Sequence, residues 1–288
     1  MYFIMIKINT ILIVVVLYKC RFEDAKSIKT LSDSLAFDCG EKLELVVYDN
    51  SPQYNPEPLW HTLFNIHYIP DYSNSGVSKA YNTAFEIGKK MNKQYLLLLD
   101  QDTEIPLMYC KKLGIISDHN QLVMPKLENR GTIISPCRYM FGRGTALRNM
   151  KDIEGVLSLK HRNFLNSGSL ISLSLYEIVG GFNENIPLYF SDFNFYNRVK
   201  KYISSYYQMN IIFHHNMSSN DETNLEQFAI RFELYCDGAY VCFQSFWGIT
   251  LMIFNVMMRS IKVGIKFRTF RFMNIALKRF YNFILINM

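Results

Sequence analysis

The sequence lacks the cysteine spacing of a zinc site or of a small disulfide-bonded domain. Its 288 residues include six cysteines, at positions 20, 39, 110, 137, 236 and 242, and no two of them form a C-x-x-C pair. Several lie in apolar stretches, so we expect buried free thiols in a reducing compartment and no structural zinc.

The chain also lacks internal repeats, low-complexity tracts and linkers rich in proline, glycine and serine, which argues against repeat architectures and disordered chains. The apolar run 11–18 is short for a membrane span and no small-residue cleavage site follows it, so we interpret residues 1–9 as a short extension before a first strand. A hydrophobic content of 49% allows one large α/β domain with an appended helical part.

Acidic residues are absent from Arg259 to the end of the sequence. Seven basic residues occur there, at positions 259, 262, 266, 268, 271, 278 and 279, within a chain of net charge +6. Aliphatic and aromatic residues are interleaved with them, a pattern typical of a helical surface for anionic lipid headgroups. A basic helix packed against its own domain is the alternative. We expect no nucleic-acid binding, because no recognised module accompanies the basic residues.

Two carboxylates one residue apart, Asp100 and Asp102, follow the apolar run 95–99. The run is too short for a helix and too continuous for a half-exposed strand, which predicts a central strand of a sheet covered on both faces. Open α/β sheets bind ligands at the carboxyl ends of such strands, and Mg²⁺ or Mn²⁺ shares oxygen ligands with phosphates. The pair therefore predicts a metal site for a phosphate-bearing substrate, with capping of the turn before Pro106 as the alternative.

Neighbouring segments indicate an α/β fold around this strand. The runs 11–18 and 43–48 predict two further strands, and the second ends at Asp49. Apolar residues recur at helical spacing from Val77 onward, with Asn74 or Ser75 as a good N-cap. The strand at 43–48, this helix and the strand at 95–99 therefore follow one another in the order strand, helix, strand.

Seven segments together resemble the inverting glycosyltransferases of family 2, and within it the rhamnosyltransferase-like enzymes of bacterial surface-polysaccharide assembly. They are LIVVVLY (12–18), VVYDNS (46–51), NSGVSKAYN (74–82), LLLLDQDT (96–103), FLNSGSLISL (164–173), GGFNENIPLYFSDFNFYNRVKK (180–201) and the histidines 214 and 215, which span about 200 residues. The resemblance implies a GT-A fold, a Rossmann-like sheet with helices on both faces. The GT-A domain would cover 1–225, with a nucleotide-sugar half at about 9–125 and an acceptor half at about 126–225, and 226–288 would form a helical, basic, membrane-associating part.

The resemblance also implies a nucleotide-sugar site. In the family the Asp after the second strand reads the nucleotide base, which here is Asp49, and residues near Tyr18 line the same pocket. Asn74 and Gly76 match the N-x-G loop beside the nucleotide, although a helix-capping role explains both residues as well.

The same resemblance implies a metal site. Asp102 would coordinate the Mg²⁺ or Mn²⁺ that bridges the diphosphate, and Asp100 would contact the ribose or the metal. A neutral imidazole is an acceptable further ligand. The spacing to Ser218 favours His215, with His214 as second candidate and a structural histidine as the alternative.

On the acceptor side the family places a catalytic Asp six residues before an Arg, as Asp192 and Arg198 stand here. An inverting transfer is one in-line displacement, which needs one carboxylate to take the acceptor proton and no protein nucleophile. Asp192 as the cap of a helix is the alternative. Asn166, Ser167 and Gly168 would form the acceptor-side loop, although N-S-G is also an ordinary turn.

The predicted function is metal-dependent transfer of a sugar from a nucleotide-diphosphate sugar to a glycan or lipid-linked acceptor in cell-surface polysaccharide synthesis. A non-catalytic nucleotide-sugar-binding module and a membrane-surface interaction protein are the alternatives. The 21 uncharged residues from Gly238 to Met258 are long enough to cross a bilayer. The positive-inside rule would then put the GT-A domain outside, away from nucleotide-sugars, so we expect a cytoplasmic protein peripheral on the inner face of the membrane.

Overall fold

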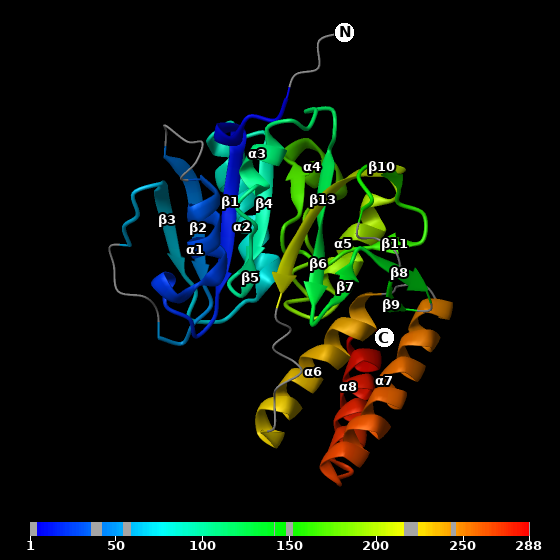
Figure 1. Cartoon of the computed structure of the whole chain (residues 1–288). Helices are drawn as coiled ribbons and strands as arrows, with labels where there is room; N and C mark the ends of the chain where they lie inside the picture. The colour runs from blue at the N-terminus through cyan, green and yellow to red at the C-terminus, as the bar shows by residue number, and fades with distance from the viewer. Residues whose placement is uncertain are drawn as a thin grey trace.

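The structure, a computed structural model, describes residues 5–35, 42–53, 59–140, 142–147, 152–215, 224–242 and 246–287. A mixed sheet forms its centre, helices cover both faces of the sheet, and three C-terminal helices pack below one half of it (Figure 1). The helices are α1 (Lys26–Leu35), α2 (Val77–Lys90), α3 (Tyr109–Leu113), α4 (Leu173–Val179), α5 (Ser191–Val199), α6 (Leu225–Cys242), α7 (Phe246–Phe267) and α8 (Arg271–Asn287).

The large sheet has the order β10-β13-β6-β12-β4-β1-β2-β3, with β5 paired to β13 and β7 to β6. Its strands are β1 (Ile11–Leu17), β2 (Leu43–Asp49), β3 (Phe64–Pro70), β4 (Tyr95–Asp100), β5 (Thr103–Glu104), β6 (Leu122–Asn129), β7 (Thr132–Ser135), β10 (Gly155–Ser158), β12 (Leu170–Ser172) and β13 (Ser205–His215). A small sheet contains β8 (Cys137–Met140), β9 (Arg143–Ala146) and β11 (Arg162–Asn163).

Strand direction brings the ends of distant segments to one edge of the large sheet. Strands β3, β2, β1 and β4 are parallel, β12 runs antiparallel between β4 and β6, and β13 is parallel to β6. The carboxyl ends of β4 and β13 therefore lie on the same side, although about 115 residues separate them in the sequence. This edge carries Asp100 and His215.

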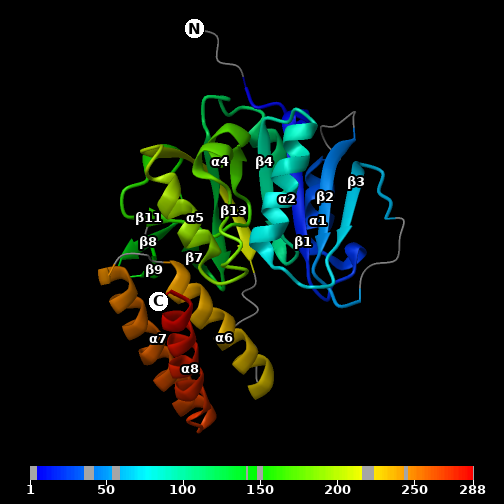
Figure 2. The ribbon, with the colours of Figure 1, turned by 180° about the vertical axis from the view of Figure 1, so that it is seen from behind.

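The core lies on both faces of the sheet, as the continuous apolar runs predict. All seven residues of β1 are buried, and so are the first five of β4. Helices α1 and α3 contribute to the cluster on one face, and α2, α4 and α5 to the cluster on the other, which Figure 2 shows from behind. The predicted strands and the helix after Gly76 are confirmed.

The predicted cap of α2 is wrong. Gly76, with φ of 90°, precedes the helix, and neither Asn74 nor Ser75 caps it with a side chain. The N–H of Val77 instead donates to the carbonyl oxygen of Pro187 at 2.8 Å. A segment far along the chain thus supplies the acceptor that a cap would otherwise provide.

The C-terminal helices form a bundle whose core is continuous with the preceding domain. Its buried cluster includes Ile186 and Phe190, which come from the segment before α5. The uncharged stretch Gly238 to Met258 divides between α6 and α7. Within the described part of the chain, one helical segment, Trp247–Phe267, has the length and apolar character of a membrane span.

The prediction that several cysteines are buried is confirmed for the described residues. Cys110, Cys137, Cys236 and Cys242 are buried and Cys20 is half-buried, and none of these five forms a disulfide. Cys39 lies outside the described residues.

Candidate active site

The carboxylates of Asp100 and Asp102 lie beside the imidazole of His215 at the carboxyl edge of the sheet. Ligand atoms of these three half-buried residues lie within 4.8 Å of one another. The backbone register explains the meeting, because β5 follows the acidic pair directly and places Thr103 opposite His215 on β13. Two carboxylates and an imidazole are a donor set that suits Mn²⁺ or Mg²⁺.

The N-S-G segment supports this cluster from the neighbouring loop. The Ser167 hydroxyl accepts the backbone N–H of Asp100 at 3.0 Å and lies 2.7 Å from the Thr103 hydroxyl, which in turn lies 2.9 Å from His215 Nδ1. Gly168 adopts φ of 82°, and a Cβ there would lie 2.5 Å from the side chain of Pro125, so glycine is required. Asn166 Oδ1 is buried without a hydrogen-bond partner among the described residues.

The middle residue of the acidic motif joins two strand ends. The side-chain oxygen of Gln101 accepts the backbone N–H of Tyr18 at 2.7 Å, and its amide donates to the Tyr18 carbonyl oxygen at 3.2 Å. The carboxyl end of β1 is therefore fixed to the acidic motif. Our sequence reasoning missed Gln101, because it treated the residue between the carboxylates as a spacer.

The two histidines point to different partners. His214 Nδ1 lies 3.3 Å from Glu128 Oε1 and its side chain is 60% exposed, whereas His215 Nδ1 lies 3.4 Å from Asp102 Oδ1 and its side chain is 13% exposed. Geometry thus favours His215 of the two as a ligand. Ser218 lies outside the described residues.

The pKa of Asp102 is raised above its ordinary value, because burial and the charge of Asp100 raise it more than His215 lowers it. A half-buried carboxylate with a second carboxylate beside it is disfavoured as an anion unless a cation neutralises it. The electrostatics of the cluster therefore suit a bound divalent cation.

Asp49 is completely buried at the end of β2. Its carboxylate accepts the backbone N–H of Ser51 at 2.9 Å through Oδ1 and the Tyr68 hydroxyl at 3.0 Å through Oδ2. Tyr18, in contrast, is 41% exposed beyond the end of β1. Asp49 thus shapes the edge of the sheet, whereas Tyr18 presents its ring to solvent.

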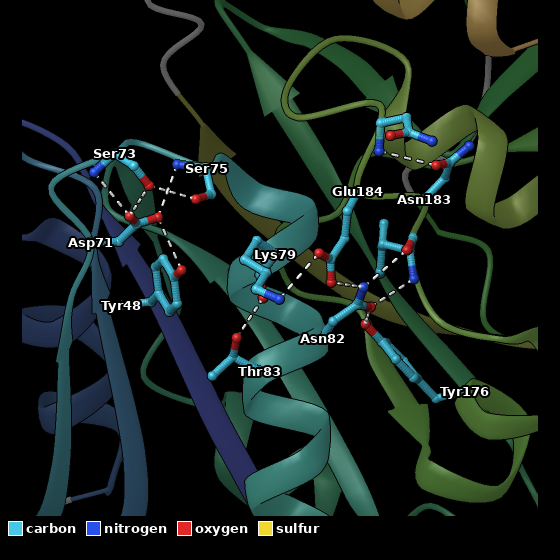
Figure 3. Close-up of polar contacts among 12 residues, drawn as sticks. Tyr48, Asp71, Ser73, Ser75, Lys79, Asn82, Thr83, Tyr176, Asn183 and Glu184 are labelled. Atoms are coloured by element: carbon cyan, nitrogen blue, oxygen red, sulfur yellow. Dashed lines mark hydrogen bonds and ion pairs between the residues drawn. The ribbon is translucent and has the colours of Figure 1, made fainter.

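A hydrogen-bonded turn that the sequence reasoning missed connects β3 to α2. The Asp71 carboxylate accepts the backbone N–H groups of Ser73 and Ser75 and the hydroxyls of Ser73 and Tyr48, as Figure 3 shows. Burial raises the pKa of Asp71, but these hydrogen bonds outweigh burial and lower it to about 2. The turn holds Asn74 at φ of 51°. An Asp two residues before a Ser, in D-x-S-N, is the Asx-turn signal that could have identified it.

Asp192 lies in the first turn of α5, where Oδ1 accepts the backbone N–H of Phe193 at 2.7 Å. Burial raises the pKa of Asp192 to about 7, and the nearby Asp100 adds to the increase. Arg198, six residues later, donates to the carbonyl oxygens of Val179 at 2.8 Å and Gly181 at 2.6 Å. Asp192 is therefore under the electrostatic influence of the acidic pair, whereas Arg198 holds the loop between α4 and α5.

Tyr81 is a further residue of the site that the motifs did not single out. Its side chain is completely buried, and its hydroxyl donates to Asp100 Oδ1 at 3.2 Å. The sequence pattern placed Tyr81 on the apolar core face of α2. The structure confirms this packing, because the ring centroids of Tyr81 and Phe182 lie 5.1 Å apart.

Comparison with known proteins adds a sequence relationship and a fold relationship. No protein-family model matches the chain. The low-salt glycan biosynthesis hexosyltransferase Agl10 of Haloferax volcanii is 25% identical over an alignment of 236 residues, which covers 78% of this chain and 72% of that protein.

Crystal structures of S. aureus TarS share the fold. Residues 1–349 of TarS superpose with a TM-score of 0.53 at 17% identity, covering 88% of this chain and 73% of TarS 1–349. The complex of the same protein with UDP-GlcNAc gives a TM-score of 0.53 at 16% identity, covering 95% of this chain and 80% of that one. The predicted fold class, a Rossmann-like α/β sheet of the GT-A type with a helical C-terminal part, is confirmed by this shared fold.

Proposed function

We propose that this enzyme transfers a hexosyl group, with inversion, from a nucleoside-diphosphate sugar to a hydroxyl group of a growing glycan, as a member of glycosyltransferase family 2. The observation that carries the proposal is the cluster of Asp100, Asp102 and His215 at the carboxyl ends of β4 and β13, together with Asp192, whose pKa the charge of Asp100 helps to raise. Similarity to a glycan biosynthesis hexosyltransferase supports a hexose and a glycan acceptor.

In this proposal Asp102, Asp100 and His215 hold a divalent cation. The three donors converge, and the Tyr81 hydroxyl and the Ser167 hydroxyl fix Asp100 from two sides. When bound, Mg²⁺ or Mn²⁺ neutralises the charge of the nucleoside-diphosphate leaving group. The protein's part is to present these ligands at the edge where the diphosphate lies.

The donor nucleotide lies, in this proposal, across the ends of β1, β2 and β4. The crystal structure of TarS with UDP-GlcNAc supports a UDP-sugar on this scaffold. Asp49, which is completely buried, shapes the base site indirectly, through its hydrogen bonds to the Ser51 N–H and the Tyr68 hydroxyl. The Tyr18 ring borders the base, and Asn74 and Gly76 border the diphosphate.

Asp192 is the proposed base. A carboxylate whose pKa lies near 7 is ionised for a large fraction of the time at neutral pH and still has the affinity to take a hydroxyl proton. It acts on the acceptor hydroxyl, which attacks the anomeric carbon opposite the leaving diphosphate. Asn166, Ser167 and Gly168 would contact the acceptor side of the site.

The first test is donor turnover. We expect Mn²⁺ or Mg²⁺ together with one nucleotide-sugar, among those carrying rhamnose, glucose, galactose or an N-acetylhexosamine, to raise the melting temperature, because a ligand that binds only the folded state stabilises it. That donor should then be hydrolysed slowly, with water as the acceptor. Stabilisation without any turnover would favour a binding module.

The pH dependence of turnover follows from Asp192. Its pKa of about 7 exceeds the ordinary value of 3.8, so the carboxylate gains its proton as pH falls through about 7. We expect kcat/KM for donor hydrolysis to be constant above this pH and to fall about tenfold per pH unit below it. A profile that stays flat down to pH 5 would remove Asp192 as the base.

We also propose that the bundle of α6, α7 and α8 rests on an anionic membrane at the cytoplasmic face, near a lipid-linked acceptor. One face of α7 is buried in the bundle, through residues such as Met252 and Val256. The opposite face carries an apolar stripe at spacings of three, four or seven residues, formed by Trp247 (79% exposed), Phe254, Met258, Ile261 and Ile265 (73% exposed).

Charge favours a membrane over a second copy of the chain on this stripe. Helices α7 and α8 contain no acidic residue, and Lys262 and Lys266 flank the stripe as exposed side chains. A two-fold contact between copies would bring like charges together, whereas anionic lipid attracts each Lys or Arg by about 1 kcal/mol. An in-plane α7 fits the stripe better than a spanning one, because its other face packs on protein.

Trp247 provides the test of this membrane surface. The chain has two tryptophans, so Trp60→Phe leaves Trp247 as the sole tryptophan, whose fluorescence can be excited selectively. We expect phosphatidylglycerol vesicles with brominated acyl chains to quench Trp247, and Trp247→Phe, which retains Trp60, to show no quenching. Unquenched Trp247 would contradict insertion of the stripe. Equal binding to neutral phosphatidylcholine vesicles would contradict the role of charge.

A further inference from the structure

A short segment leads directly to the proposed base. Residues Ile186 to Phe190, which we name the strap, precede α5 and Asp192. Phe190 adopts φ of 69° at the junction with the helix. The position of the strap therefore determines where α5, and the carboxylate in its first turn, begin.

On one side the strap lies against the start of α2. The Val77 N–H donates to the Pro187 carbonyl oxygen at 2.8 Å, and the Ser78 hydroxyl donates to the Ile186 carbonyl oxygen at 2.6 Å. A Cβ on Gly76 would lie 2.2 Å from the Pro187 carbonyl oxygen. The backbone of Gly76 is in direct contact with the backbone of Pro187, so the strap has no space to move toward α2.

The loop before the strap is equally constrained. Asn82 on α2 donates to the Phe182 carbonyl oxygen at 3.0 Å and to Glu184 at 2.9 Å, and it accepts the Phe182 N–H at 2.8 Å and the Tyr176 hydroxyl at 2.7 Å. Figure 3 shows Asn82 between Glu184 and Tyr176, with Lys79 on Glu184. All four hydrogen-bonding positions of this amide are occupied.

On its other side the strap lies against α6, a helix of the C-terminal bundle. A Cβ on Gly238 would lie 2.3 Å from the Tyr189 carbonyl oxygen, closer than real Cβ contacts. The Phe190 ring, which is buried, packs on the Tyr235 ring at 5.0 Å. Asn194 on α5 donates to the Cys242 carbonyl oxygen at 3.3 Å. Helix α6 therefore contacts the strap and α5 on both sides of Asp192.

We propose that Gly238 is a positioning residue for catalysis. Because Gly238 has no side chain, α6 can approach the Tyr189 carbonyl closely, and this contact holds the strap, and with it Asp192, in position in the site. The inference rests on the proposed role of Asp192 as base. Gly238 lies 46 residues from Asp192 in the sequence, and it is not one of the residues of the acidic cluster. It is a residue of the helical bundle that acts on the reaction through the strap.

The test is Gly238→Ala in the full chain, with release of nucleoside diphosphate from the donor as the readout. The new methyl group meets a backbone oxygen, so the strap or α6 must shift by a large fraction of an ångström. A misplacement of about 1 Å costs up to about 100-fold in rate, and we expect kcat to fall between about 10-fold and 100-fold. The donor KM, the Mn²⁺ requirement and vesicle binding should stay at wild-type values.

Gly264→Ala is the matched control. Its Cβ would also approach a backbone oxygen, that of Thr269 at 2.9 Å, but at the turn between α7 and α8, away from the strap. We expect it to lower the melting temperature of the bundle and to leave kcat unchanged. A purely structural role of Gly238 would instead lower stability, donor binding and kcat together, or would leave kcat as high as in Gly264→Ala, and either result overturns the inference.

If Gly238→Ala does not fold, Tyr235→Leu tests whether α6 positions Asp192 through the strap. It removes the ring on which Phe190 packs without adding volume next to the strap, and we expect the same loss of kcat at unchanged donor KM. Wild-type kcat in Tyr235→Leu would refute the positioning role of α6. Asp192→Asn separates this failure from a failure of the proposed function, because an enzyme that survives Asp192→Asn has a different base.

Discussion

Replacing Asp192 by Asn should reduce kcat by a factor of about 10² to 10⁴ while donor affinity stays nearly unchanged. Asn has the shape of Asp and its side-chain oxygen can still accept the Phe193 N–H, so the first turn of α5 keeps its hydrogen bond. It cannot take a proton from the attacking hydroxyl. The measurement is steady-state release of nucleoside diphosphate together with a binding titration of the donor.

The stability of the same variant separates a catalytic role from a structural one. Because the pKa of Asp192 is raised from 3.8 to about 7 when the chain folds, the folded state holds the proton more tightly than the unfolded state, so the free energy of unfolding falls as pH rises from about 4 to about 7 and stays low above that. Asp192→Asn should therefore melt at the same or a higher temperature at pH 8. A lower melting temperature with weakened donor binding would make Asp192 a structural helix cap.

Glu177→Gln is the matched control for a carboxylate-to-amide change. Glu177 lies on α4 and forms an exposed ion pair with Lys89, and such pairs contribute little. We expect wild-type kcat and donor affinity. A comparable loss of kcat in Glu177→Gln would show that the assay reports general damage.

The parts of the fold that the sequence predicted are those with one dominant local signal. The runs of β1 and β4 are buried on both faces, so every residue is apolar and the pattern is unambiguous. Strand β3, with mostly half-buried residues in F-N-I-H-Y-I-P, mixes polar and apolar positions and escaped prediction. Its place is set by pairing with β2 and not by its own composition.

The candidate site was predictable where one motif carries two groups, and not where distant segments meet. Only Gln101 separates Asp100 from Asp102 in the sequence, and the carboxyl end of a buried strand places both carboxylates at an edge of the sheet. The support from Gln101, Tyr81 and Ser167 depends on side-chain directions that only the packed structure fixes. The contact of Gly238 with the strap had no sequence signal, because a glycine inside a helix reads only as a weak helix former.

Replacing Asp102 by Ala should abolish the metal-dependent binding of nucleoside diphosphate and, with it, donor turnover. The remaining pair, Asp100 and His215, offers too few ligands to hold a divalent cation against water. Removing the charge should not unfold the protein, because burial and Asp100 already disfavour that charge in the folded state. The measurement is the rise in melting temperature on adding UDP, GDP or dTDP, with and without Mn²⁺.

Glu104→Ala is the control for this loss. Glu104 is two residues from Asp102, on β5, but it forms an exposed ion pair with Lys26 at 2.6 Å and is not part of the metal cluster. We expect Glu104→Ala to keep the full Mn²⁺-dependent stabilisation by the nucleotide. If Asp102→Ala retained it as well, the assignment of Asp102 as a metal ligand would be wrong. The edge of β4 would then bind the diphosphate through backbone and side-chain donors alone, and the acidic pair would be a capped turn before Pro106.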